Sequence, residues 1–194
     1  MKASLWGPPF WKALFDSAWS CKGDYTHLLP TLLLEVVPLI LPCETCRKNY
    51  ANHIPEVTAK AKCEPRDGKT SFRWLYFMKK EVNSTFKPPR PNIPFGELSE
   101  RYVLHGGSVH EVELADVLVL ISLSSRDLKR DDAFIDFCRI LSQTLCIPHD
   151  SSLKVHLSKM AKPIVNSAYK CSKSVRTEYG LPVPVLNYYK EMSR

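Results

Sequence analysis

The motif Cys43-Glu44-Thr45-Cys46 directly follows an apolar stretch, residues 28–42, in which leucine, valine and isoleucine recur at helical spacing. Two cysteines separated by two residues close a small disulfide ring. A helix that begins at the first cysteine favours the thiolate of that residue through its N-terminal dipole. Such a pair can be oxidised, attacked by another thiol and reoxidised. The pattern therefore predicts a redox-active dithiol at the start of a helix.

Helical periodicity extends over most of the chain. In the first half it predicts four helices, at residues 8–20, 28–41, 43–60 and 71–83. In the second half it predicts three more, at residues 109–124, 131–146 and 151–179. The proline cluster at residues 87–94 cannot continue a helix and reads as an extended connection. We therefore expect an all-α protein with two domains, residues 1–95 and residues 96–194.

Charge and cysteine usage restrict the kind of partner. Most of the net charge of +7 falls in the first 95 residues, where 14 lysines and arginines face 8 acidic residues. This excess suggests an anionic ligand such as nucleic acid, membrane phosphate or a phosphate-bearing cofactor. The chain has seven cysteines, an odd number, and outside the close pair they are scattered, so no disulfide scaffold is evident.

The longest apolar stretch contains Glu35 and several prolines and is shorter than the roughly 20 residues that span a bilayer. The N-terminus lacks the apolar core and the cleavage site of a signal peptide. We therefore expect no membrane partner and a cytosolic or nuclear compartment. No recognised base-reading motif accompanies the basic charge, so a nucleic-acid-binding helical domain is a lesser alternative.

Three chemistries use a Cys-x-x-Cys pair. Zinc could be held by Cys43, Cys46, His53 and Cys63, but Cys46 and His53 on one continuous helix lie roughly 10 Å apart by helical rise. A thioredoxin-type site follows a β-strand, whereas the preceding segment has a helical period. A flavin-linked dithiol needs an aromatic slot and cationic groups.

The chain offers both features of a flavin site. Trp11 and Phe15 lie one helical turn apart, as do Trp74 and Met78. The polar and cationic residues that follow the second pair are Lys79, Lys80, Asn83 and Lys87. We therefore prefer the flavin-linked dithiol, and a zinc-bearing interaction module remains the alternative.

Three blocks carry a family resemblance: Trp-Gly-Pro-Pro-Phe-Trp at residues 6–11, Leu-Pro-Cys-Glu-Thr-Cys-Arg at residues 41–47, and Phe-Arg-Trp-Leu followed by Glu-Val-Asn within residues 72–83. In order and spacing they resemble the Erv/ALR family of FAD-linked sulfhydryl oxidases, most closely the short versions encoded by large DNA viruses. The resemblance covers about residues 4–90. It implies a four-helix bundle with a short fifth helix around FAD.

The resemblance also implies roles for residues. Cys46 would lie against the flavin and Cys43 would exchange with substrate. Cofactor-binding positions are expected at Gly7, Trp11, Trp74, Val82, Asn83 and Lys87. Phe15 and the pair Lys79-Lys80 depart from the family, which commonly has a histidine and a His-Asn pair there. Phe15 could still pack on the ring and Lys79 could contact phosphate. Tyr50 and His53 lie on the side of Cys46 and are further candidates to line the flavin; no metal is expected.

The implied partners are molecular oxygen and protein thiols, or a downstream thiol redox carrier. No second Cys-x-x-Cys is present to act as a shuttle. Family members usually form homodimers, but residues 96–194 offer an alternative cover for the first bundle. Cys146, His149 and His156 repeat Cys43, Cys46 and His53 at an offset of 103 residues, which suggests a degenerate second copy. The expected location is the cytoplasm of a host cell, or the virion.

Overall fold

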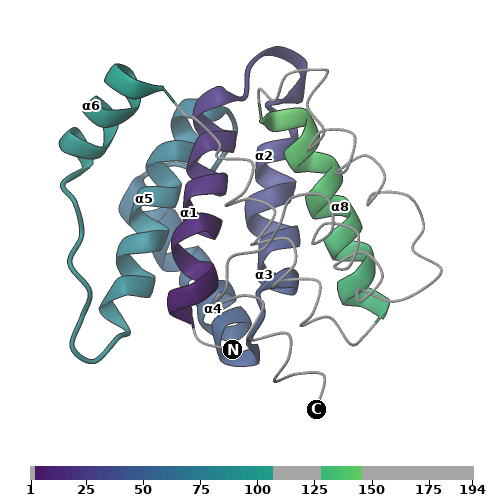
Figure 1. Cartoon of the computed structure of the whole chain (residues 1–194), viewed down its shortest axis with the longest axis horizontal. Coiled ribbons are helices and arrows are strands. Elements are labelled where there is room, and N and C mark those ends of the chain that lie inside the picture. Colours follow the sequence, from purple (N-terminus) through teal and green to yellow (C-terminus); the bar gives the residue numbers. More distant parts are fainter. Residues whose placement is uncertain (1–2, 107–127, 146–194) are drawn as a thin grey trace.

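The computed structural model describes residues 3–106 and 128–145 (Figure 1). These residues form helices joined by turns and extended connections, and they include no strand, which confirms the expected all-α class. The elements are α1 (Ala3–Ser20), η1 (Gly23–Tyr25), α2 (Leu28–Pro30), η2 (Thr31–Val36), α3 (Val37–Ile40), α4 (Glu44–Ala61), α5 (Gly68–Ser84), α6 (Phe95–His105) and α8 (Leu128–Thr144). The helices expected at residues 109–124 and 151–179, and the repeat at Cys146, His149 and His156, lie outside the described residues.

The apolar run before the dithiol is not one regular α-helix. It comprises α2, the π-helical segment η2 and α3, with Pro30 at the end of α2 and Pro38 near the start of α3. Proline has no backbone N–H, so an uninterrupted α-helical hydrogen-bond ladder cannot pass through both positions. The segment still buries the apolar stripe expected of it, including Leu32, Leu33 and Ile40.

The helices α4 and α5 form an antiparallel pair whose ends are well defined. Residue Lys62 adopts a left-handed conformation (φ 54°) and ends α4. The start of α5 has a capping box, in which the Asp67 side chain accepts from the Thr70 backbone N–H while the Thr70 hydroxyl accepts from the Asp67 N–H. Gly68, the first residue of α5, lies close to the end of α1.

A ten-residue segment that we call the strap, residues 85–94, joins α5 to α6. Figure 1 shows it running along the outside of the bundle before α6. The helix α6 was not expected from the sequence, because it begins directly after the proline cluster. Its Tyr102 packs edge-on against Phe72 of α5 (ring centroids 4.9 Å apart) and donates a hydrogen bond to the buried carboxylate of Asp16 in α1 (2.8 Å).

The helix α8 shares the core of the N-terminal helices. It corresponds to the helix expected at residues 131–146 and packs against α3, η2 and α1, at the opposite side of the bundle from α6 (Figure 1). Its Phe137 is fully buried and stacks on Phe10 of α1, with ring centroids 5.8 Å apart. Buried side chains from α1 through α8 therefore form one continuous hydrophobic cluster.

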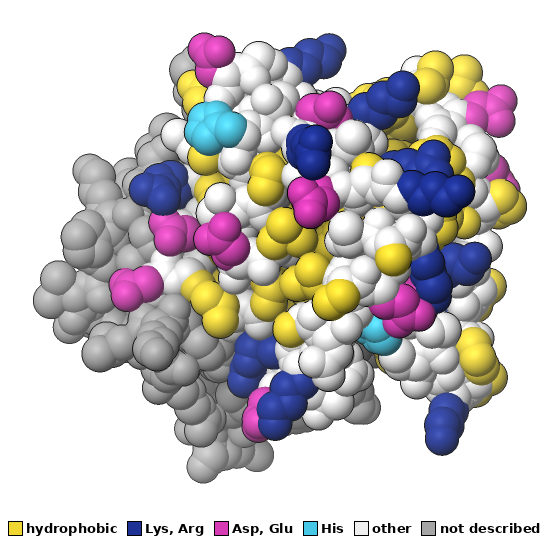
Figure 2. Space-filling model, turned by 180° about the vertical axis from the view of Figure 1, so that it is seen from behind, with side chains coloured by type: hydrophobic (Ala, Val, Ile, Leu, Met, Phe, Trp, Pro, Cys, Tyr) yellow, Lys and Arg dark blue, Asp and Glu magenta, His cyan; other side chains and the backbone are white. Residues whose placement is uncertain are grey.

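Viewed from behind, the surface is mixed in character. Figure 2 shows hydrophobic side chains gathered in the middle of this face, with basic and acidic side chains interspersed around them. Within the described residues, every helix is too short or too polar to cross a membrane.

Candidate functional site

The first half of α1, the start of α4, the end of α5 and the strap surround a cavity of about 520 Å³. This volume is in the range of about 300–1,000 Å³ typical of ligand sites. Eight of the residues expected at the site line it: Gly7, Trp11, Cys43, Cys46, Tyr50, Lys79, Val82 and Asn83. The structure therefore brings side chains from all three sequence blocks to one place.

The dithiol forms part of the cavity wall. Cys43 and Cys46 are joined as a disulfide, with Cα atoms 5.1 Å apart, and both are partly buried. Cys43 is the N-cap of α4, and its sulfur accepts a hydrogen bond from the backbone N–H of Cys46 (3.0 Å). Arg47 anchors this turn by donating to the carbonyl oxygen of Leu41 (2.8 Å). The expected start of a helix at the dithiol is thus confirmed.

Aromatic side chains of α1 form an apolar wall. Trp6, Phe10 and Trp11 line the cavity together, and the Trp6 ring packs edge-on against Phe10 at 5.7 Å. Two buried donors in the wall, Trp6 Nε1 and the Tyr50 hydroxyl, have no hydrogen-bond partner among the described residues. Burial raises the pKa of Tyr50, so its hydroxyl keeps its proton. Buried donors without partners are rare in folded proteins.

The charged groups at the cavity are all cationic. Lys79 and Arg90 line it, and no Asp or Glu of the described residues does so. Lys79 is half-buried, its ammonium lies 5.7 Å from the centre of the Phe15 ring, and burial lowers its pKa. The guanidinium of Arg90 lies 3.8 Å from the centre of the Phe86 ring. An apolar cavity with two cations suits an aromatic ligand that carries negative charge.

Phe15 and Trp74 do not line the cavity. Phe15 is buried against Phe72, with ring centroids 5.1 Å apart, one helical turn further along α1 than Trp11. Trp74 is fully buried behind Tyr50; its Nε1 donates to the hydroxyl of Thr58 (3.1 Å) and its ring lies 6.3 Å from that of Tyr50. Both residues support the cavity wall without facing it.

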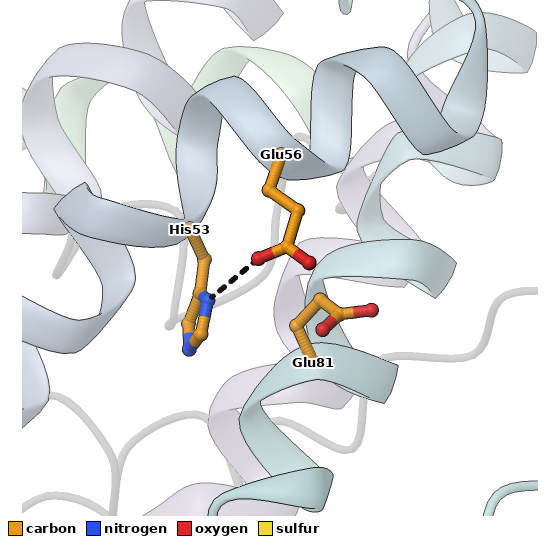
Figure 3. A group of neighbouring side chains, drawn as sticks. All are labelled: His53, Glu56 and Glu81. Atoms are coloured by element: carbon orange, nitrogen blue, oxygen red, sulfur yellow. Dashed lines mark ion pairs between the residues drawn. The ribbon is translucent and has the colours of Figure 1, made fainter.

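His53 and Lys87 also lie outside the cavity lining. In Figure 3, His53 and Glu56 extend from α4 toward Glu81 of α5, and His53 Nδ1 lies 3.7 Å from a Glu56 carboxylate oxygen. Lys60 already pairs with both carboxylates, at 2.7 Å to Glu56 and 2.8 Å to Glu81. One cation therefore already pairs with both carboxylates of this group.

The zinc set considered from the sequence is not assembled. Cys43 and Cys46 are bonded to each other, and the group of potential metal ligands found within the described residues is His53, Glu56 and Glu81, without any of the three cysteines. Cys63 is partly buried at the end of α4, where its thiol approaches the carbonyl oxygen of Thr70 (3.9 Å).

Several residues of the site were not expected from the sequence: Trp6, Phe10, Asn49, Phe86, Arg90 and Pro91. Trp6 and Phe10 belong to the first sequence block, and helical spacing from Gly7 and Trp11 would have found them. Phe86, Arg90 and Pro91 belong to the strap, whose path depends on tertiary contacts and has no sequence period.

Comparison with known proteins adds no relative, since no family model, no curated protein and no solved structure matches the chain. The family resemblance therefore rests on the three motif blocks alone.

Proposed function

We propose that this chain is an FAD-dependent sulfhydryl oxidase, which forms disulfides from thiols with molecular oxygen as the electron acceptor. The observation that carries the proposal is the Cys43–Cys46 disulfide in the wall of an aromatic, cationic cavity. The motif blocks support it further. They are separate in the sequence, yet residues of each line the same cavity as the dithiol.

The residues present fit a flavin. Trp11 and its aromatic neighbours offer apolar faces for a ring system. Lys79 and Arg90 supply positive charge for a pyrophosphate. FAD, when bound, would accept two electrons and two protons from the reduced cysteine pair and deliver them to oxygen as hydrogen peroxide.

The cysteines carry out the exchange with substrate. A substrate thiolate attacks Cys43 Sγ, a mixed disulfide forms, and Cys46 leaves as the thiolate. The second substrate thiol then attacks the substrate sulfur of the mixed disulfide and releases Cys43. The Cys46 N–H that points at Cys43 Sγ (3.0 Å) favours negative charge on Cys43 as it leaves. Reoxidation of the pair completes the reaction 2 R–SH + O₂ → R–S–S–R + H₂O₂.

The substrates in this proposal are protein thiols or the dithiol of a downstream redox carrier. A virus-encoded enzyme of this kind would act in the host cytoplasm or the virion, where it would supply disulfides that the surrounding reducing compartment does not favour.

Purification of the full chain tests the proposal directly. The protein should be yellow, and it should consume oxygen and release hydrogen peroxide when a dithiol is added. The variants Cys43→Ser and Cys46→Ser should each abolish oxygen consumption while they retain the yellow colour, because neither removes the cavity. Cys63→Ser is the matched control and should remain active. A colourless protein that binds no added flavin would refute the proposal, as would an active double variant of Cys43 and Cys46.

A further inference from the structure

The strap contributes a cation and an aromatic ring to the cavity. Arg90 and Phe86 both line it, and the Arg90 guanidinium lies 3.8 Å from the Phe86 ring centre. No carboxylate of the described residues forms an ion pair with Arg90. A guanidinium that rests on an aromatic ring keeps its N–H groups free at the edge of its plane, where they can bind phosphate in bidentate fashion.

The side chain of Asn83 holds the strap in this position. Its amide Nδ2 donates to the Asn92 side-chain oxygen (2.7 Å) and to the Pro91 carbonyl oxygen (3.4 Å). The backbone carbonyl oxygen of Asn83 also accepts from the backbone N–H of Arg90 (3.0 Å). Both amide hydrogens of this largely buried residue are therefore directed to the strap, although the resemblance implies that Asn83 binds the cofactor itself.

We propose that Arg90, supported by Phe86, forms the subsite for the phosphate-bearing end of the flavin nucleotide, and that Asn83 is its positioning residue. The inference deepens the proposed function and rests on it. The subsite makes FAD the preferred ligand over riboflavin, which carries the same ring system without phosphate. Arg90 takes this role because the strap places it at the cavity, whereas Lys87 on the same strap does not line it.

Flavin binding by the full 194-residue chain, freed of bound flavin, tests the subsite. FAD and riboflavin are titrated separately, and the quenching of flavin fluorescence is measured. The variant Arg90→Gln should weaken FAD binding about tenfold, the scale of one lost hydrogen bond to a charged group, and should change riboflavin binding less than about twofold. Arg66→Gln, which makes the same charge change at an exposed site away from the cavity, is the control and should leave both affinities unchanged.

A double-variant cycle tests the positioning role. Asn83→Leu should weaken FAD binding in the parent chain and should have little further effect in the Arg90→Gln background, because it acts through Arg90. If Asn83→Leu weakened FAD binding by the same factor in the parent and in the Arg90→Gln background, the positioning role would be overturned.

The outcomes separate the inference from the proposed function. If the parent binds flavin but Arg90→Gln binds FAD as tightly, or loses FAD and riboflavin to the same extent, the subsite is overturned and the oxidase proposal stands. If the parent binds neither flavin, the proposed function fails and the subsite fails with it.

Discussion

Replacing Gly68 by alanine should destabilise the protein, although alanine is the better helix former. A Cβ at this position would lie 2.5 Å from the carbonyl oxygen of Ala18 and 3.2 Å from that of Cys21. Both are backbone atoms, so no side-chain rotation relieves the overlap, and α5 must move away from α1. Overpacking of this kind costs about 1–3 kcal/mol, and the gain in helix propensity is at most about 1 kcal/mol. We expect a net loss of about 1–2 kcal/mol.

Urea unfolding followed by circular dichroism measures this loss. In a chain of this size it should correspond to a decrease of about 2–8 °C in the thermal midpoint. Gly96→Ala is the matched control: Gly96 also lies in the first turn of a helix, but a Cβ there meets nothing within 4 Å. It should be neutral or stabilising by up to about 1 kcal/mol. Equal or greater stability of Gly68→Ala relative to the parent would refute the close approach of α5 to α1.

Three further stability predictions use the same urea assay. Asp67→Ala removes the α5 cap and should cost about 1 kcal/mol at neutral pH. Hydrogen bonds lower the pKa of Asp67 from 3.8, so the stability that its carboxylate contributes is present above that pH and is lost as the pH falls below it. A difference in unfolding free energy between the parent and Asp67→Ala that stays the same in acid would contradict this. Tyr102→Phe should cost about 1.5 kcal/mol, because it removes a donor from the buried Asp16 carboxylate, and an unchanged midpoint would exclude that bond. Phe137→Ala should cost about 3–5 kcal/mol, since its ring is fully buried on Phe10; a loss below about 1 kcal/mol would mean that α8 does not pack there.

Local patterns in the sequence predicted the helices well where one signal dominates. The helix after the dithiol was expected at residues 43–60, and α4 spans Glu44–Ala61 with Cys43 as its cap. The apolar period of the segment before it was also read correctly as helical. That period could not reveal the π-helical turn of η2, which lies between Pro30 and Pro38 and packs against α8.

The positions of individual side chains were harder to predict. Trp11 and Phe15 lie one turn apart on α1, yet Trp11 lines the cavity while Phe15 packs on Phe72. A helical period identifies an apolar stripe but does not tell which part of the stripe meets a cavity and which part meets a neighbouring helix. His53 was expected to line the flavin because it lies on the side of Cys46, but it lies beside Glu56 and Glu81 instead.

The strap and α6 depended most on tertiary structure. The proline cluster correctly indicated an extended connection, but nothing in its composition showed that the connection would fold back over the cavity. That path follows from the hydrogen bonds of Asn83 to residues eight and nine positions later. The helix α6 was missed because a short amphipathic segment directly after several prolines resembles a continuation of the linker.

The stacking of Phe137 on Phe10 means that this ring of α1 is covered by a helix of the same polypeptide. Because α8 and α1 belong to the same polypeptide, the effective concentration of α8 at α1 is high and does not depend on the concentration of the protein. Dilution that would separate an assembly of independent molecules leaves such a contact in place. The burial of Phe10 under α8 should accordingly stay constant from micromolar to nanomolar protein.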